Sequence, residues 1–211
     1  MKKWAVPLLV CFGLALLAGT PLFATDVAFW TETLDGPAAP TGWTALGDWQ
    51  FGKPTGVTGD PKTGHTGNNV YGYNLTGPYG PNIAPPRYLT TKAINCTGKY
   101  AVKLQFWRWL VVQDADYDQA NIQVSNNNTT WTDVWVNSKD ADHVDTSWKL
   151  VIYDISSVAD NKATVYVRWG MASQTNKPYT YGGWNIDDLS LLAAGPTAVY
   201  SWNLTGAEPA G

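Results

Sequence analysis

Residues that carry catalysis or hold metals are scarce in this sequence of 211 residues. It has two cysteines and two histidines, and charged residues make up only 15% of it. The motifs H-E-x-x-H, G-x-S-x-G, G-x-x-x-x-G-K-[ST] and G-x-G-x-x-G do not occur, so zinc-protease, serine-hydrolase and nucleotide sites have no support in the sequence. The sequence therefore favours a protein that binds over one that catalyses, and we predict that it is not an enzyme.

Positive charge is also in short supply. The 14 basic residues stand against 17 acidic ones, for a formal net charge of −3. Nucleic-acid binding needs clustered Lys and Arg to contact phosphates, so a nucleic-acid partner is excluded. Aromatic residues are abundant instead, with 12 Trp and 11 Tyr, as in many exported all-β proteins.

Residues 1–24 have the composition of a leader that is removed on export. Lys2 and Lys3 precede an apolar run, and the segment ends in Ala24, a small residue suited to cleavage. A membrane anchor is the alternative, but the prolines and glycines of the run favour export and removal of the leader. We therefore predict that the mature protein is secreted or lies at the cell surface, without stable insertion in a membrane. Removal of the leader leaves Cys96 as the only cysteine, so the thiol is either a small buried residue or a site of pairing between chains.

Residues 25–192 are predicted to form one all-β domain. Val102, Leu104 and Phe106 alternate with polar or aromatic residues, and residues 121–136 are predicted to form a hairpin that turns at three asparagines. Nine or ten strands are expected, which fits a two-sheet antiparallel jelly-roll sandwich. Residues 52–69 are glycine-rich and polar without an apolar period, and form a long loop. Residues 193–211 are an Ala/Gly/Pro-rich tail, either loosely ordered or the start of a further segment.

The stretch G-G-W-N-I-D-D-L-S-L-L, residues 182–192, is predicted to be the closing strand. In a regular strand Trp184, Ile186, Asp188 and Ser190 share one face. Adjacent aspartates are poor strand formers, so Asp187 and Asp188 need compensation from a bound cation, from backbone hydrogen bonds or from solvent.

Several phrases of the sequence resemble bacterial MAM-like domains, jelly-roll modules attached to secreted peptidases and other exported proteins. The phrases are F-W-x-E at residues 29–32, W-Q-F-G at 49–52, N-V-x-G-Y-N-L at 69–75, F-W-R-W at 106–109, and residues 183–189. The resemblance implies a concanavalin-like or MAM-like sandwich that serves adhesion and contacts a glycan or protein, without catalysis. It also implies a structural calcium site held by acidic residues of the first and last strands, which here are Glu32, Asp187 and Asp188. Hydrogen bonding of the aspartates to loop backbone is the alternative.

Two pairs of tryptophans are candidate ligand-binding residues. Trp107 and Trp109 share a strand face with Lys103 and Gln105, and Trp131 and Trp135 lie on the returning strand of the hairpin. Exposed indoles on a strand face are surfaces on which sugar rings stack; packing against the core or a loop is the alternative.

We therefore predict an exported, non-catalytic binding or adhesion module that recognises a glycan or an extracellular protein surface. Its possible cofactor is a structural Ca²⁺ ion. The alternatives are a structural surface protein that self-associates and, less favoured, an accessory domain of a larger hydrolase. The oligomeric state stays open.

Overall fold

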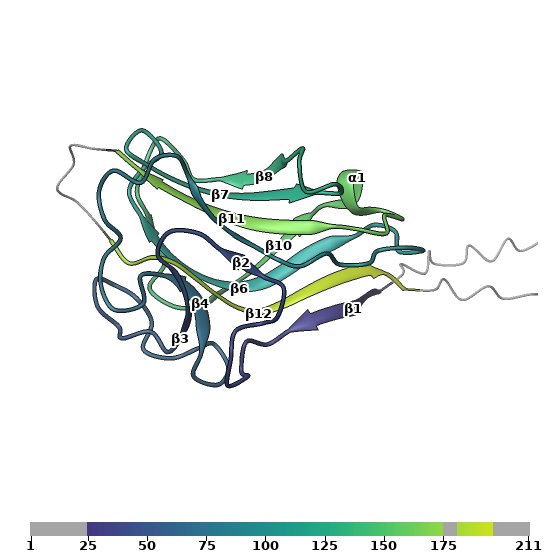
Figure 1. Ribbon diagram of the computed structural model, residues 1–211, viewed down its shortest axis with the longest axis horizontal. Coiled ribbons are helices and arrows are strands. Elements are labelled where there is room, and N and C mark those ends of the chain that lie inside the picture. The colour runs from purple at the N-terminus through teal and green to yellow at the C-terminus, as the bar shows by residue number, and fades with distance from the viewer. Residues whose placement is uncertain (1–24, 175–180, 196–211) are drawn as a thin grey trace, which may run out of the picture. The chain divides into compact units, whose positions relative to one another are not determined.

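A computed structural model describes residues 25–174 and 181–195 (Figure 1). Residues 25–195 form one compact unit. The predicted leader and most of the predicted tail, residues 196–211, lie outside the described residues. No helix in the described ranges has the length and apolar character needed to cross a membrane.

The described residues form two antiparallel sheets that face each other, as the sequence predicts (Figure 1). The seven-stranded sheet contains β1 (Asp26–Glu32), β3 (Trp49–Gly52), β4 (Val70–Tyr73), β6 (Lys103–Val112), β9 (His143–Val144), β10 (Lys149–Asp154) and β12 (Gly183–Ala194). The five-stranded sheet contains β2 (Thr44–Ala45), β5 (Arg87–Thr90), β7 (Asp118–Ser125), β8 (Thr132–Val136) and β11 (Tyr166–Ser173). One short helix, α1 (Ser156–Ala159), lies between β10 and β11. The fold is an all-β antiparallel sandwich of jelly-roll type.

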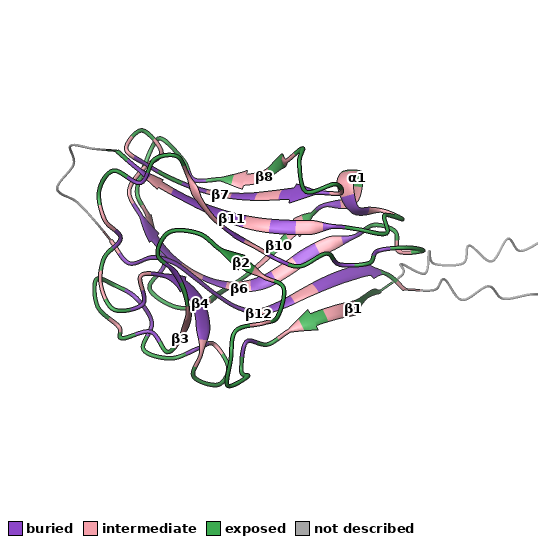
Figure 2. Ribbon diagram, viewed as in Figure 1, coloured by how far each residue is buried: buried purple, intermediate pink, exposed green. Residues whose placement is uncertain are grey.

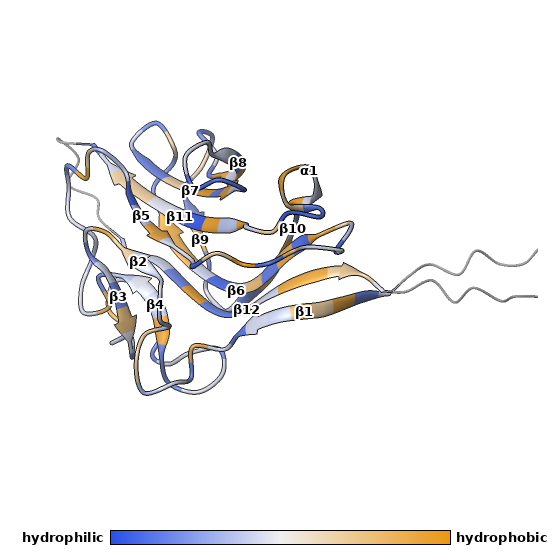
Figure 3. Cartoon of the chain, turned by 45° about the vertical axis from the view of Figure 1, so that its right-hand side comes forward, coloured by the Kyte–Doolittle hydropathy of each residue, from blue (hydrophilic) through white to orange (hydrophobic). Residues whose placement is uncertain are grey.

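The alternation of apolar and polar residues places the core between the two sheets. Along β6 every second residue is buried from Leu104 to Leu110, and β7 and β11 follow the same rule (Figure 2). Along these strands hydrophobic and hydrophilic residues are mixed, as Figure 3 shows. The largest fully buried side chains include Trp169 and Trp184, whose apolar area makes them strong contributors to stability.

The closing strand β12 departs from regular alternation, so the prediction of a single face for Trp184, Ile186, Asp188 and Ser190 was wrong. Its register with β6 shifts between Asp187 and Ser190, and Asp188 has φ of 46°. Aspartate tolerates this left-handed conformation better than most residues, and the resulting bulge reverses the two faces. Trp184 and Ile186 point into the core before the bulge and Leu189 and Leu191 after it.

Candidate functional site

The outer face of the five-stranded sheet carries a connected group of partly exposed polar and aromatic side chains. On β11, Val167 and Trp169 point into the core, so the neighbouring Arg168 points outward. On β7, Asn121 and Gln123 point outward by the same rule. We call this surface the polar face and define it by Tyr88, Gln119, Asn121, Gln123, Trp131, Asp133 and Arg168.

Arg168 lies between two aromatic rings on the polar face. Its guanidinium carbon is 3.8 Å from the ring centroid of Tyr88 and 3.9 Å from that of Trp131. Tyr88 comes from β5 and Trp131 from the turn before β8, so the three side chains form a stack across the sheet. A guanidinium held over two ring faces gains cation–π attraction from both, which fixes its position.

Hydrogen bonds extend this stack along the strands. Arg168 Nε donates to Gln123 Oε1 at 2.7 Å, and Gln123 Nε2 donates to Asp133 Oδ1 at 2.8 Å. Asn121 Nδ2 donates to the same Asp133 oxygen at 3.2 Å. Because each of these side chains has a partner that limits its rotation, the face is preorganised for a ligand.

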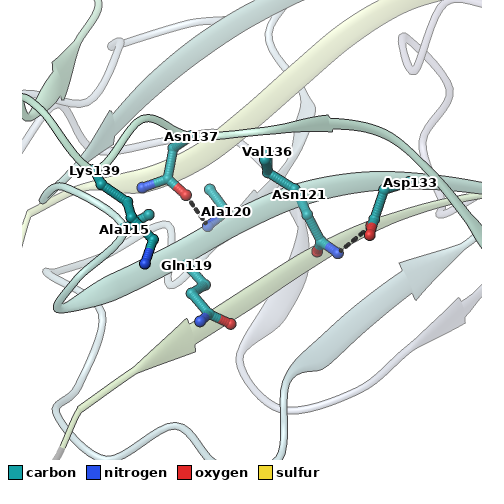
Figure 4. A pocket seen from close by; sticks show the side chains of 8 residues that line it. All are labelled: Ala115, Gln119, Ala120, Asn121, Asp133, Val136, Asn137 and Lys139. Atoms are coloured by element: carbon teal, nitrogen blue, oxygen red, sulfur yellow. Dashed lines mark hydrogen bonds between the residues drawn. The ribbon is translucent and has the colours of Figure 1, made fainter.

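A cleft of about 500 Å³ adjoins the network where β7 and β8 meet (Figure 4). Gln119 and Asn121 line one side, and Asp133, Val136 and Lys139 line the other. Amide, carboxylate and ammonium groups therefore surround an apolar patch, a mixture that suits a polyhydroxylated ligand.

Gly170 keeps the centre of the polar face flat. A Cβ here would lie 2.0 Å from Asn121 Oδ1 and 2.6 Å from Tyr88 Cε1. The lack of a side chain lets these two residues approach each other across β11.

Of the predicted tryptophans, Trp131 belongs to the polar face and Trp135 does not. Ile122 pairs with Trp135 and Gln123 pairs with Asp133, which leaves one extra residue between the two tryptophans. This bulge turns Trp135 inward, where its ring centroid is 5.7 Å from that of Trp184. The two indoles therefore lie on opposite faces of β8.

Trp107 and Trp109 lie together on the outer face of the seven-stranded sheet, as predicted, but a loop covers them. The His65 ring stacks on Trp107 with centroids 3.6 Å apart, and Trp109 Nε1 donates to the Gly59 carbonyl at 2.7 Å. Trp148 meets Trp109 edge to face. The contacts of both indoles fit loop packing, the alternative that the sequence left open, and a ligand-binding role for them stays a prediction.

Asp187 is buried where the same loop meets β12, and it binds loop backbone. Its Oδ2 accepts the N–H groups of His65 at 2.7 Å and Thr66 at 3.2 Å. Asp188 accepts a 2.6 Å contact from His65 Nδ1 and a 2.8 Å hydrogen bond from Thr66 Oγ1. Burial, followed by the charge of Asp188, raises the pKa of Asp187 to about 7.

Glu32 lies on β1 opposite Leu189 of β12, and so at the same corner as the two aspartates. Its Oε1 accepts the Leu34 N–H at 3.4 Å. Within the described residues, no three side chains of His, Cys, Asp or Glu are grouped so that they could hold a metal ion. The calcium site at Glu32, Asp187 and Asp188 stays a prediction.

Gly64 lets the loop approach Asp187 closely, because a Cβ there would collide with the Thr66 carbonyl oxygen and lie 2.8 Å from Asp187 Oδ2. Calcium prefers carboxylate and carbonyl oxygens as ligands, and this corner brings together the carboxylates of Asp187 and Asp188. In the structure Asp187 Oδ2 already accepts two N–H groups, so both sequence-based alternatives retain physical support.

The sequence did not reveal most of the polar face. In the sequence, Asn121 and Gln123 are the polar half of an alternating strand, and Arg168 is a basic residue next to a tryptophan, so neither pattern indicates a binding site. Tyr88 lies on another strand and joins Arg168 through the pairing of β5 with β11. A usable signal was the run of outward amides at alternate positions, Gln119, Asn121 and Gln123.

Comparisons with known proteins give one sequence relative and a set of distant structures. No protein-family model matches the chain. Over 170 residues it is 32% identical to Bacillopeptidase F of Bacillus subtilis (strain 168), an alignment that covers 77% of this chain and 11% of that protein. The chain thus spans about a tenth of the length of this curated relative.

Among solved structures, one similar chain is the K3 cleaved adhesin domain of Lys-gingipain from Porphyromonas gingivalis w83. It is 16% identical at a TM-score of 0.49, over 78% of this chain and 98% of that chain. Another is a family 22 carbohydrate-binding module of Clostridium thermocellum Xyn10B, 14% identical at a TM-score of 0.47, over 81% of this chain and 96% of that chain.

Proposed function

We propose that this protein is an exported, non-catalytic module that binds a glycan on the polar face of its five-stranded sheet. The observation that carries the proposal is the Tyr88–Arg168–Trp131 stack, which adjoins a cleft lined by hydrogen-bonding side chains.

The physical chemistry of sugars matches this surface. A pyranose ring has apolar C–H faces that pack on aromatic rings, and hydroxyl groups that exchange hydrogen bonds with planar amides, carboxylates and guanidinium groups. Trp131 and Tyr88 supply the rings, and Gln119, Asn121 and Asp133 supply the polar groups. The groups are already held by one another, so less conformational entropy is lost on binding.

A structural calcium ion is part of the proposal. Glu32, Asp187 and Asp188 would hold it where the first and last strands meet the loop of residues 53–69. Bound there, the ion would neutralise the aspartate pair and hold this loop to the sheet. Its role is stability, because the polar face belongs to the other sheet.

The MAM-like character and the export of the domain are likewise proposed. They rest on the sequence phrases and on the apolar leader, and the match to a segment of Bacillopeptidase F agrees with a module that can be attached to a larger protein. If the chain is part of a larger peptidase, we propose that it is an accessory domain and does not itself cleave peptide bonds.

A second candidate function is self-association through the edge strand β10. Leu150 and Ile152 point outward there and are 46% and 51% exposed. β10 is the end strand of its sheet path, and edges of this kind accept further strands.

The glycan proposal is tested by affinity electrophoresis through gels that contain soluble polysaccharides. We expect at least one polymer to retard the protein and Trp131→Ala to weaken that retardation at least about tenfold, the size expected for an aromatic at the centre of a binding surface. Trp107→Ala, on the other sheet, is the matched control and should migrate as the parent. If Trp107→Ala abolishes retardation and Trp131→Ala does not, the site has been assigned to the wrong sheet.

A further inference from the structure

No carboxylate of the described residues forms an ion pair with the guanidinium of Arg168, although the charge of Asp133 acts on it from farther away. The two rings fix its plane and Gln123 accepts its Nε–H. Across residues 25–174 and 181–195, its Nη1 and Nη2 atoms make no hydrogen bond and no ion pair with a protein group. Up to four N–H donors therefore have no protein acceptor among the described residues.

The other arginine near the core shows how differently a structural arginine is used. Arg108 is buried and binds Asp145 with both Nε and Nη2, at 2.9 and 3.3 Å. Both donors on this edge of the guanidinium therefore bind a carboxylate of the same chain. Arg168 is half-exposed, and its fork is unused.

A fixed, unpaired guanidinium fork is a receptor for a planar or tetrahedral anion. Two parallel N–H groups match the two oxygens of a carboxylate, or two oxygens of a sulfate, and such charge-assisted pairs are about twice as strong as neutral ones. The rotamer entropy of the arginine side chain has already been lost to the aromatic stack, so a ligand would not have to supply it.

We propose that the glycan bound on the polar face is acidic, and that Arg168 binds a uronate carboxylate or sulfate ester while neighbouring sugar units occupy the cleft. This inference rests on the proposed glycan function and assigns the class of sugar within it. Arg168 is the residue that sets the preference for charge.

The other charges of the face agree with one localised anion rather than a polyanion-binding surface. Asp133 is negative, but its Oδ1 accepts hydrogen bonds from the side-chain amides of Asn121 and Gln123 on β7, which partly neutralise this charge. Lys139 in the cleft has Asp116 at 3.2 Å. With a formal net charge of −3 the chain exerts no long-range attraction on an acidic polymer, so the preference must arise at contact.

The test measures binding of the unsubstituted full chain to pairs of polymers. The two polymers of a pair share a backbone and differ in charge. Polygalacturonate is compared with its methyl ester, and dextran sulfate with dextran, so the first pair tests a carboxylate and the second a sulfate. We expect one acidic polymer to bind at least tenfold more tightly than its neutral partner, a difference of about 1.4 kcal/mol.

Variants at Arg168 separate recognition of charge from support of the rings. Arg168→Gln should remove the tenfold preference, because it should weaken binding of the acidic polymer at least tenfold more than binding of the neutral one. Arg168→Lys, which keeps the charge and loses the fork, should retain only part of it. Lys103→Gln, which removes one positive charge on the other sheet, should keep the full preference.

Two outcomes would overturn the inference and leave glycan binding intact. One is equal binding of the acidic and neutral polymers by the parent protein. The other is an equal loss of both in Arg168→Gln, which would mean that the arginine only props the rings. Failure of every polymer to bind would instead contradict the proposed function itself.

Discussion

Ionisation of Asp187 gives a signed prediction for stability. Its pKa is raised from 3.8 to about 7 in the folded state, first by burial and then by Asp188. The folded state thus holds the Asp187 proton more tightly than the unfolded state does. Stability from this group is present at low pH and is lost as pH rises from about 4 to about 7. At about 1.4 kcal/mol per pKa unit, the loss has an upper limit of about 4 kcal/mol.

Calcium should oppose that loss, because a cation favours the ionised carboxylate. At one hundred times its dissociation constant, an ion bound only to the folded state adds about 2.7 kcal/mol. In excess chelator we expect the stability of the parent relative to Asp187→Asn to fall between pH 4.5 and 7.5. With saturating calcium the fall should be largely abolished for the parent, and calcium should not stabilise the variant to the same extent.

Urea unfolding followed by tryptophan fluorescence measures these free energies. Asp26→Asn is the matched control, since Asp26 forms a half-exposed ion pair with Lys103. Because each variant is compared with the parent, the contributions of other titrating groups to the pH dependence of stability cancel. One such group is Asp60, whose pKa burial raises to about 7 in both proteins. If stability relative to Asp187→Asn rises with pH in chelator, the account of the aspartate pair is wrong. If calcium changes neither protein, the metal site is refuted.

Three further predictions concern packing, reactivity and charge. Gly170→Ala should lower the free energy of unfolding by about 1–3 kcal/mol through overpacking, and should weaken glycan binding. Gly80→Ala, whose Cβ would meet nothing within 4 Å, should change neither; scanning calorimetry measures the stability and titration calorimetry the binding. Burial raises the pKa of Cys96 to about 11. In the chain without its predicted leader we therefore expect no reaction with a thiol reagent at pH 8 until the protein unfolds. A rapid reaction of the folded protein would contradict the buried position of Cys96. Arg108→Met should destabilise by about 3–5 kcal/mol at pH 7 because the buried Asp145 loses both arginine bonds and keeps only the Leu110 N–H and the His143 ring as partners. Urea unfolding measures this cost, and a cost below about 1 kcal/mol would refute the importance of the pair.

Alternation was enough to predict the sandwich. The β7–β8 hairpin follows from apolar residues at every second position and from asparagines that accept left-handed angles, as Asn128 does with φ of 59°. The long loop predicted at residues 52–69 is found at residues 53–69, after Gly52 ends β3, because glycine-rich polar sequence without an apolar period does not favour a strand.

Single inserted residues defeated the same reasoning. A bulge at Asp188 exchanged the two faces of β12, and an extra residue between Trp131 and Trp135 placed the two indoles on opposite sides of β8. Bulges depend on how the neighbouring strand pairs, which the local sequence does not encode.

The polar face was hidden for a related reason. Tyr88 and Arg168 are 80 positions apart and become neighbours only through the register of β5 with β11. Trp107 and Trp109 gave the stronger local signal, a pair of aromatics on one strand face, yet the loop of residues 53–69 covers them.

The most direct test of the central claim is a titration of the ¹⁵N-labelled protein with an oligosaccharide from a polymer that it binds, followed at the indole N–H resonances. The Trp131 resonance is assigned by its disappearance in Trp131→Phe. We predict that it shifts with ligand while the resonances of Trp107 and Trp109 stay in place. Shifts confined to Trp107 and Trp109, with Trp131 unmoved, would contradict the assignment of the glycan site to the five-stranded sheet.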